Sequence, residues 1–517
     1  MQGNVERASD NYKWWVLATV VFGAFASILD STIVNTALPR IQHDFGADLH
    51  LASYVATGYI LAAGVIVPAS GFLANRFGMK RVYVSSLVLF TFGSALCGVA
   101  PNIDLLIAAR ILQGAGGAAL FPLSFAMLFS VFSSEERGKA NGIFGIPVLV
   151  APALGPTLGG YLTQYVDWRW VFYVNLPVGI VGVAMGLRFL RETPLRESLR
   201  FDVPGFLFAS SGLGLLLYGL SNLAYDGWDS VATVSGPILI SVVLLSVFVL
   251  VVLRAKMPLL HLRLYRRRNY VLGTIIVLVG TVALFGPGFL LPQYLQGLRG
   301  QTPFAAGLLL LWGGLGAVAG SILSGQLYNR LGPKVLIWIG LTDLLATSIL
   351  LAVWTTADSN LNLLIPIMLV RGLGLPMMLQ SVNTIALDGI RGPDLPDATT
   401  LNVVMRNIMG SLSIAILTNY LQSRNTFHVG ALLHGVAGRF AHTGVGGITG
   451  NQMPLPVQHA LAQAYQDTYI LVTILVLPAY LVVGFLRQPS WRSPGALRGS
   501  PPVVPERAGP LPVGGME

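Results

Sequence analysis

The sequence predicts an all-α, polytopic membrane protein, and three observations support that prediction: the composition, a series of long apolar runs, and the distribution of basic residues. Of 517 residues, 54% are hydrophobic and 10% are charged, whereas an ordinary soluble domain is about a quarter charged. A soluble chain of this size could not hide so much apolar surface from water, but a bilayer favours it. The 59 glycines are consistent with close helix contacts in a membrane.

Apolar runs long enough to cross a bilayer occur fourteen times, since a transmembrane helix needs about 20 residues. We predict spans at 14–37, 51–74, 82–100, 102–129, 139–163, 170–189, 203–223, 231–253, 270–293, 303–328, 335–356, 361–384, 397–420 and 468–487. The first run lacks a small-residue cleavage site, so it is interpreted as a span and not as a signal peptide. The tail 488–517 is rich in Pro and Gly and is expected to be disordered.

The basic residues predict an orientation. With residues 1–13 in the cytoplasm, the cytoplasmic segments hold 24 of the 32 Lys and Arg, and the external segments hold 5. Because cytoplasmic loops are enriched in Lys and Arg, both termini are predicted to be cytoplasmic and the chain to lie in the plasma (cytoplasmic or inner) membrane. The net charge of +10 is spread over short loops, which argues against a nucleic-acid partner.

A short motif occurs twice and indicates an internal repeat. Residues 70–81 read SGFLANRFGMKR and residues 324–335 read SGQLYNRLGPKV, which agree at seven of twelve positions. Two weaker similarities accompany this motif: Leu38-Pro39 matches Leu291-Pro292, and the stretch 113–116 resembles 371–374. Recurrence by chance is the alternative, but three echoes in register favour a true repeat.

The repeat predicts two six-helix bundles, at 14–189 and 270–487, with two inserted helices at 203–253 and a basic linker at 254–269. Repeated halves of this kind place a substrate site at their interface near the middle of the membrane. Within the second bundle, the segment 421–467 is expected to form an external loop.

Seven stretches together resemble a known family. They are LDSTIVNTALP at 29–39, GFLANRFGMKR at 71–81, RILQGAGG at 110–117, APALGPTLGG at 151–160, WRWVFYVNLPVG at 168–179, PLLHLRLYRRRNY at 258–270 and MRNIMGSLSIAI at 405–416. In this order they resemble the major facilitator superfamily, specifically its fourteen-span drug:proton antiporter family of the EmrB/QacA type. The resemblance covers about residues 14–487. It implies the major facilitator fold, no cofactor, and export of lipophilic compounds in exchange for protons.

Asp30 and Arg110 are the candidate proton-coupling residues. A carboxylate inside a span costs about 2.5–3.5 kcal/mol on insertion scales and usually marks function, with a structural role as the alternative. Asp30 lies nine residues before Pro39 and Arg110 nine residues after Pro101, so both are expected about 13 Å below the outer surface. The resemblance places their spans together along the central cavity, where the guanidinium can couple protonation of Asp30 to conformation. A permanent ion pair is the alternative.

The fifth span carries Gly155, Pro156, Gly159 and Gly160, which match the antiporter motif of the family. Proline removes a helix hydrogen bond, and glycines admit close helix contact. The thirteenth span, its counterpart in the repeat, has no copy of this motif. A mechanistic role is therefore favoured over plain packing.

The resemblance assigns a cytoplasmic gate to the first copy of the repeated motif. Its residues are Gly71, Asn75, Arg76, Gly78, Lys80 and Arg81. Relatives usually carry Asp at the position of Asn75. An amide can still form hydrogen bonds at a helix start, but it cannot make the charge–dipole contact of the family.

Five further residues are candidates for substrate contact or charge pairing: Asn35, Gln113, Arg406, Asp343 and Arg371. Asp343 and Arg371 have similar depths on consecutive spans, and a structural pair between them is the preferred interpretation, with a substrate role as the minority alternative. Arg406 lies in the thirteenth span. An anionic substrate group or carboxylate and a backbone carbonyl are equally favoured as its partner.

Proton-coupled export of hydrophobic or amphipathic compounds, that is multidrug efflux, is the leading hypothesis. The alternatives are a narrow-specificity exporter of a fatty acid or metabolite, an importer, and a membrane-embedded receptor or enzyme. The sequence has no HExxH, GxSxG or GxxxxGK[ST] motif, so neither an enzyme nor ATP-driven transport is indicated. The expected partners are a lipophilic small molecule, protons, the lipid bilayer and, through residues 421–467, a periplasmic adaptor protein.

No metal site is expected. Cys97 is the only cysteine, which also excludes an internal disulfide. Four of the seven histidines lie in the segment 421–467, but their spacing fits no zinc signature. They are His428, His434, His442 and His459.

Overall fold

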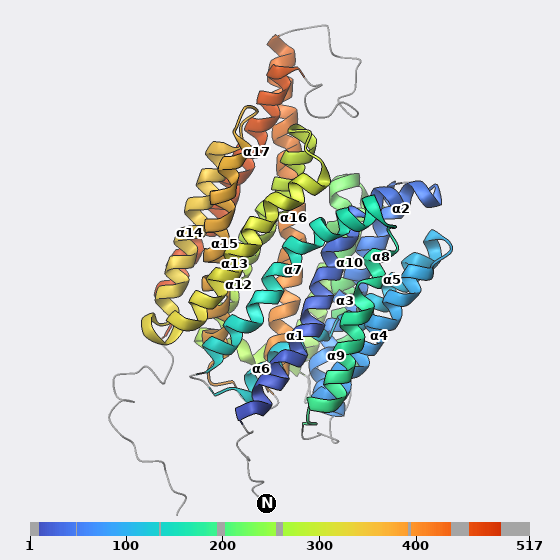
Figure 1. Ribbon diagram of the computed structural model, residues 1–517, viewed down its shortest axis with the longest axis vertical. Coiled ribbons are helices and arrows are strands. Elements are labelled where there is room, and N and C mark those ends of the chain that lie inside the picture. Colours follow the sequence, from blue (N-terminus) through green and yellow to red (C-terminus); the bar gives the residue numbers. More distant parts are fainter. Residues whose placement is uncertain are drawn as a thin grey trace, which may run out of the picture.

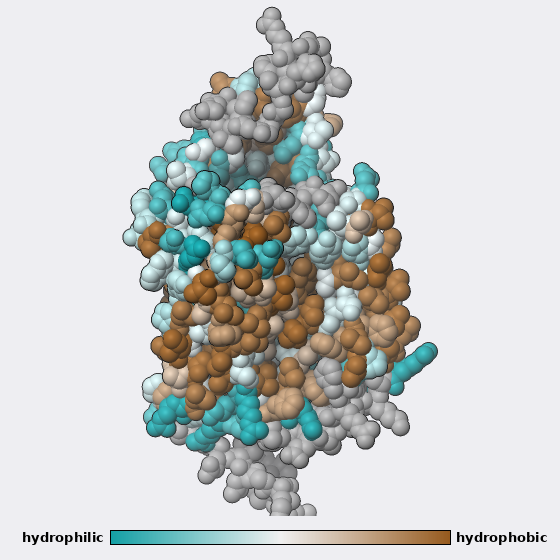
Figure 2. Space-filling model, turned by 90° about the vertical axis from the view of Figure 1, so that its right-hand side faces the viewer, coloured by the Kyte–Doolittle hydropathy of each residue, from teal (hydrophilic) through white to brown (hydrophobic). Residues whose placement is uncertain are grey.

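The computed structural model describes residues 10–47, 49–133, 136–193, 202–254, 262–390, 394–435 and 454–487. Within these ranges the protein is built from helices without strands, and fourteen helical segments are long and apolar enough to cross a membrane. The predicted fold class and number of spans are confirmed. On the face shown in Figure 2, hydrophobic residues form a band across the middle of the molecule, with hydrophilic residues above and below it. The tail 488–517 and the part 255–261 of the basic linker lie outside the described residues.

The N-terminal half supplies the first six spans. Its elements are α1 (Asp10–Ile33), η1 (Val34–Thr36), α2 (Leu38–Phe45), α3 (Leu49–Phe77), α4 (Met79–Val99), α5 (Ile103–Gly117), α6 (Leu120–Val131), α7 (Arg137–Tyr165), α8 (Trp170–Tyr173) and α9 (Asn175–Phe189). α5 and α6 together form the fourth span. That span starts at Asn102, whose side chain accepts a hydrogen bond from the Leu105 N–H and so satisfies one of the free donors of the first turn.

The rest of the chain forms the inserted pair and the C-terminal half. The elements are α10 (Val203–Asp226), η2 (Val231–Ser235), α11 (Gly236–Arg254), η3 (Leu262–Arg266), α12 (Arg268–Gln293), η4 (Tyr294–Leu298), α13 (Pro303–Leu331), α14 (Pro333–Trp354), η5 (Leu361–Leu363), α15 (Leu364–Ala386), α16 (Asp394–Gly435), α17 (Leu455–Val476) and α18 (Pro478–Gly484). α17 and α18 together form the last span. In Figure 1, α12 to α15 lie on one side of the bundle and α1, α3, α4 and α9 on the other.

The two copies of the repeated motif fold alike. Gly78 and Gly332 stand between consecutive helices with φ of 93° and 89°, a region that glycine adopts readily and L side chains do not. Two residues further on, Lys80 and Lys334 donate from Nζ to backbone carbonyls in α9 (2.9 Å) and α18 (3.2 Å). Each lysine therefore ties the turn to the last span of its own half.

The two halves meet along α3 with α16 and along α7 with α13 and α15. Two of these contacts lie toward the predicted cytoplasmic end, which we call the basic end. The hydroxyls of Ser70 on α3 and Thr400 on α16 are 2.9 Å apart. The amide of Asn141 on α7 donates to the carbonyl of Gln380 on α15 at 3.0 Å. Polar contacts thus join the halves at the basic end.

The inserted helices pack beside the junction of α3 and α16. The Ser210 hydroxyl of α10 donates to the Val65 carbonyl of α3 at 2.6 Å, and Leu217 covers Gly64 of α3 so closely that a methyl group there would overlap it. Toward the opposite end, Leu220 of α10 belongs to the same apolar cluster as Ala415 of α16. α10 therefore contacts both halves.

The segment 421–467 is not the simple loop that was expected. α16 continues to Gly435 and α17 starts at Leu455, so the two helices extend beyond the bundle, as the upper part of Figure 1 shows. Asp467 of α17 joins them by accepting from Arg424 Nε at 2.6 Å and lying 2.8 Å from His428 Nε2. Each helix satisfies its own backbone groups outside the membrane, and hydropathy alone does not reveal such a polar helix. The side chain of His434 and all of His442 lie outside the described residues.

Candidate functional site

Asp30 and Arg110 form a buried ion pair. Asp30 lies on α1 and Arg110 on α5, with 0% and 1% of their side-chain surfaces exposed. A guanidinium nitrogen of Arg110 is 2.5 Å from Asp30 Oδ2. The structure therefore brings together the two residues whose similar depth was inferred from the sequence.

The Asp30 carboxylate accepts two more hydrogen bonds. The side-chain amide of Gln113 on α5 donates to Asp30 Oδ1 at 2.9 Å, and that of Asn175 on α9 donates to the same oxygen at 2.7 Å. Both amides also donate to the hydroxyl of Ser94 on α4, at 2.9 Å and 3.2 Å. A charge-assisted network of this kind stabilises the ionised carboxylate away from water.

Arg110 is held on its other sides as well. Its Nε donates to the Val55 carbonyl of α3 at 2.8 Å, and another nitrogen donates to Gln113 Oε1 at 2.6 Å. The ring of Tyr59 on α3 lies 4.5 Å from the guanidinium carbon. Because every one of these partners belongs to α1, α3, α4, α5 or α9, the network lies inside the N-terminal half. The resemblance had implied a place along a central cavity, and the structure instead shows a closed, buried site.

Asn175 and Ser94 were not among the predicted residues. The sequence did contain a signal for Asn175, because it is an amide within an otherwise apolar span and within the quoted stretch 168–179. A buried amide costs free energy unless it is hydrogen-bonded, so its presence there indicates a polar partner. Ser94 carries no such signal, since serine is common in membrane helices and can satisfy its own hydroxyl on the preceding turn.

The motif glycines of α7 differ in their surroundings. A methyl group on Gly155 would overlap the side chain of Thr32, and one on Gly159 would come within 2.5 Å of the Ile33 carbonyl of α1. Around Gly160 no atom lies near enough to meet an added methyl group. Pro156 lies within α7 without ending it. Two glycines therefore set the close approach of α7 to α1, and the third does not.

The predicted gate residues divide into two groups. Gly71 and Asn75 face the other half: a methyl group on Gly71 would come within 2.6 Å of Asp397 Oδ1 on α16, and the Asn75 amide donates to that oxygen at 3.5 Å. Asp397 is 2% exposed and lies in the first turn of α16, where the helix dipole favours a negative charge. The acid at this contact is therefore Asp397 of α16, whereas α3 contributes the amide of Asn75.

The remaining gate residues act within the N-terminal half. The N–H groups of Lys80 and Arg81 donate to the Glu192 carboxylate at 3.2 Å and 3.3 Å, which caps the start of α4. Gly78 lies against the same carboxylate. Arg76 keeps one buried guanidinium nitrogen without a hydrogen-bond partner among the described residues. Gly78, Lys80 and Arg81 therefore tie α4 to the chain after α9.

The predicted direct pair between Asp343 and Arg371 is wrong. Arg371 of α15 donates to Thr347 and Ser348 hydroxyls of α14 at 3.0 Å and 3.1 Å, and to the Ala283 carbonyl of α12 at 2.5 Å. Asp343 Oδ2 is buried without a hydrogen-bond partner in the described part of the chain. The guanidinium reaches hydroxyls one turn beyond Asp343, because residues four apart lie on the same face of a helix.

Arg406 and Asn35 complete the predicted set. Arg406 lies on α16, and its guanidinium carbon stands 4.1 Å from the centre of the Phe121 ring of α6, in the other half. Asn35 is exposed in the short helix η1. The structure thus places Asn35 outside the buried network and Arg406 at the junction of the halves.

The fold and site define a multi-pass membrane protein built from two related helical halves, with buried charges inside the spans. The Major Facilitator Superfamily model matches residues 20–414, and the chain belongs to this superfamily of transporters. It is similar to putative multidrug resistance protein MdtD of Escherichia coli O1:K1 / APEC, with 34% identity over 78% of this chain and 84% of that protein. It is also similar to the multidrug resistance protein B homolog of Mycobacterium tuberculosis, with 31% identity over 90% of this chain and 88% of that one.

A further relative and a solved structure agree with this assignment. The uncharacterized MFS-type transporter YhcA of Bacillus subtilis is 32% identical over 80% of this chain and 77% of its own. The crystal structure of the human organic anion transporter MFSD10 matches with a TM-score of 0.57 and 15% identity, over 90% of this chain and 99% of that one. The structural match shows the shared fold. Together, these relatives point to a transporter family and not to an enzyme family.

Proposed function

We propose that this transporter is a proton-coupled antiporter that exports hydrophobic or amphipathic compounds. The observation that supports it best is the Asp30 network, in which one carboxylate inside the membrane accepts hydrogen bonds from Arg110, Gln113 and Asn175. A carboxylate at this depth is the kind of group that carries protons in transporters.

The coupling follows from the charge balance of the network. In the arrangement described, the carboxylate neutralises Arg110 and orients two amides from α5 and α9. Protonation removes that negative charge and leaves a buried guanidinium without its counter-ion, which is strongly unfavourable. The helices that hold the network then gain from a rearrangement that rehydrates or re-pairs Arg110. Proton uptake at Asp30 thereby biases the conformation of the N-terminal half.

The α7 glycines and the basic-end contacts complete the proposed cycle. Gly155 and Gly159 add no side chains of their own to the contact between α7 and α1, which lets α7 slide on α1. Gly71 and Asn75 meet Asp397 where the halves must part for a substrate to enter from the cytoplasm. We place the basic end in the cytoplasm and the protein in the cytoplasmic membrane, because 24 of the 32 Lys and Arg fall on that side. The helical extension of α16 and α17 is the surface proposed for a periplasmic adaptor.

Asp30→Asn tests the coupling. Asparagine has nearly the same shape and still forms hydrogen bonds, but it does not release a proton. In vesicles with an imposed pH gradient, we expect the variant to fold with Arg110 rehydrated or re-paired, as proposed for protonated Asp30, and to perform substrate counterflow while losing uphill export. Each proton that moves inward contributes about 2.3 kcal/mol per 100 mV, and that contribution disappears. Uphill export by the variant with an unchanged response to pH would place proton coupling elsewhere.

A further inference from the structure

We infer that Arg406 is an anion-binding residue at the junction of the two halves, and that the exported compounds include amphipathic anions, with a carboxylate, sulfonate or phosphate group on an apolar body. This inference rests on the proposed export function and adds the charge of the substrate to it. It depends on the contacts of Arg406, on its aromatic surroundings and on the positions of the in-span carboxylates.

Arg406 differs from the other two arginines that lie well inside spans. Arg110 is paired with Asp30 at 2.5 Å, and Arg371 donates to hydroxyls and carbonyls of α14 and α12. For Arg406 the structure shows the Phe121 ring and, within the described residues, no carboxylate, hydroxyl or carbonyl that accepts a hydrogen bond from it. Its guanidinium is therefore available to a ligand.

Arg406 lies deep in the membrane, where a guanidinium without a charge partner is energetically unfavourable. It lies twelve residues from the start of α16, which is about 18 Å along the helix axis. An arginine in the middle of a span is costly on insertion scales. A contact with an aromatic face offsets only part of that cost. An anion that binds here would supply the charge balance that the protein itself does not.

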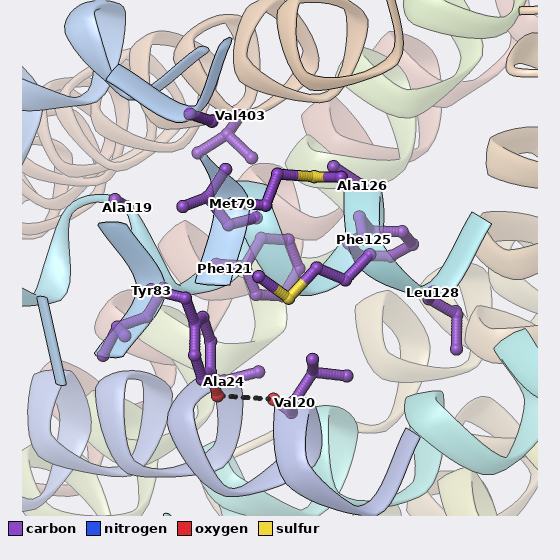
Figure 3. Close-up of a cluster of buried hydrophobic side chains, with 14 of the residues drawn as sticks. Val20, Ala24, Met79, Tyr83, Ala119, Phe121, Phe125, Ala126, Leu128 and Val403 are labelled. Atoms are coloured by element: carbon purple, nitrogen blue, oxygen red, sulfur yellow. Dashed lines mark hydrogen bonds between the residues drawn. The ribbon is translucent and has the colours of Figure 1, made fainter. Parts of the chain in front are cut away.

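The aromatic side chains near Arg406 suit the apolar or aromatic part of a ligand. Phe121 and Phe125 of α6 lie 5.1 Å apart between ring centres, and Phe144 of α7 lies 5.0 Å from Phe125. Figure 3 shows Phe121, Phe125 and Val403 of α16 among the side chains of one buried hydrophobic cluster. The cation comes from the C-terminal half and the rings from the N-terminal half. A ligand between them would contact both halves, as alternating access requires.

The carboxylates within the described spans lie elsewhere and do not pair with Arg406. In the described part of the spans, mid-membrane carboxylates occur at Asp30, which is enclosed in the N-terminal half, and at Asp343 on α14, which packs against Gly374 of α15. Asp397 precedes Arg406 on α16 by nine residues, about 14 Å along the axis, and contacts α3. The junction of the halves is therefore electropositive in its middle. It favours anions over lipophilic cations.

The test uses one fluorescent alkyl chain that ends in a sulfonate, a primary amide or a trimethylammonium group. Binding to the purified full-length protein and proton-driven export from vesicles are both measured. For Arg406→Gln we expect a loss of sulfonate affinity of about tenfold or more, the range for a hydrogen bond to a charged group, with amide affinity nearly unchanged. Arg406→Lys should retain the order of preference. Arg424→Gln, on the same helix but paired with Asp467, is the matched control and should leave the preference unchanged.

The outcomes separate the two proposals. Sulfonate binding that depends on Arg406, without proton-driven export of any probe, would support Arg406 as an anion-binding residue and overturn the export proposal. Export of the ammonium probe, with the same charge preference in wild type and Arg406→Gln, would overturn the inference and leave the export proposal standing. Size-exclusion profiles and melting temperatures check the folding of each variant. If Arg406→Gln does not fold, Arg406→Lys decides, because a lysine keeps the charge but loses the planar fork and should weaken sulfonate binding.

Discussion

Asp397 on α16 accepts a hydrogen bond from the side-chain amide of Asn75 on α3, across the junction of the two halves at the basic end. The family resemblance implies an acid at the position of Asn75, whereas here the acid is on the opposite helix. The amide fits that arrangement, because two carboxylates at this distance would repel each other in a site where Asp397 is 2% exposed. An amide–carboxylate contact therefore joins the two halves at this point without an acid at position 75.

Exchange of these two side chains tests the contact. Asn75→Asp should loosen the basic end, whereas the double variant Asn75→Asp, Asp397→Asn should restore it. The coupling energy is expected in the range of about 0.5–3 kcal/mol, typical of residues in direct contact. The measurement is the rate of maleimide labelling of Ala74→Cys, a buried position on α3. Asp394→Asn, one turn earlier on α16, is the control. Equal labelling of the single and double variants would show that the two residues act independently.

The α7 glycines provide a matched pair of substitutions. Gly159→Leu should slow or abolish exchange, because its side chain would meet Ile33 of α1 and Thr36 of η1. Gly160→Leu should leave exchange nearly normal, because an added methyl group there meets nothing. Transport rates of both variants, normalised to folded protein, check this prediction. Similar rates for the two variants would remove close packing of α7 on α1 from the mechanism.

Asp343 and Arg371 should contribute very differently to stability. Arg371→Gln removes hydrogen bonds that tie α15 to α12 and α14, and we expect a loss of about 1–3 kcal/mol, the range for unsatisfied buried partners. Asp343→Asn removes a carboxylate whose Oδ2 lacks a partner among the described residues, so stability should be unchanged or higher. Thermal unfolding in detergent measures both effects. A comparable loss for Asp343→Asn would reinstate the direct pair.

The orientation can be tested at two exposed positions. Arg266→Cys, in η3, should react with an impermeant maleimide only from the cytoplasm, and Asp229→Cys, between α10 and α11, only from outside. The native Cys97 is buried and provides a low background. Reaction of both cysteines from the same side would contradict the alternation of spans on which the topology depends.

The sequence alone was enough for the fold class, the number of spans and the two charged residues of the main buried pair, whereas the meeting of their two spans was implied by the family resemblance. The first three depend on local properties of the chain. A run of about 20 apolar residues is a span wherever it packs, and a charge within such a run is costly wherever it lies. Asp30 and Arg110 could therefore be found by their type and depth, without knowledge of their neighbours.

The tertiary structure decided which side chains meet. Only packing of α9 against α1 brings Asn175 to Asp30, and only the approach of α16 to α3 brings Asp397 to Asn75. Arg371 lies near the depth of Asp343 yet bonds to other groups, because the rotation of a helix about its axis is set by its neighbours. Depth along a span follows from the sequence, whereas the direction in which a side chain points depends on how the helices pack.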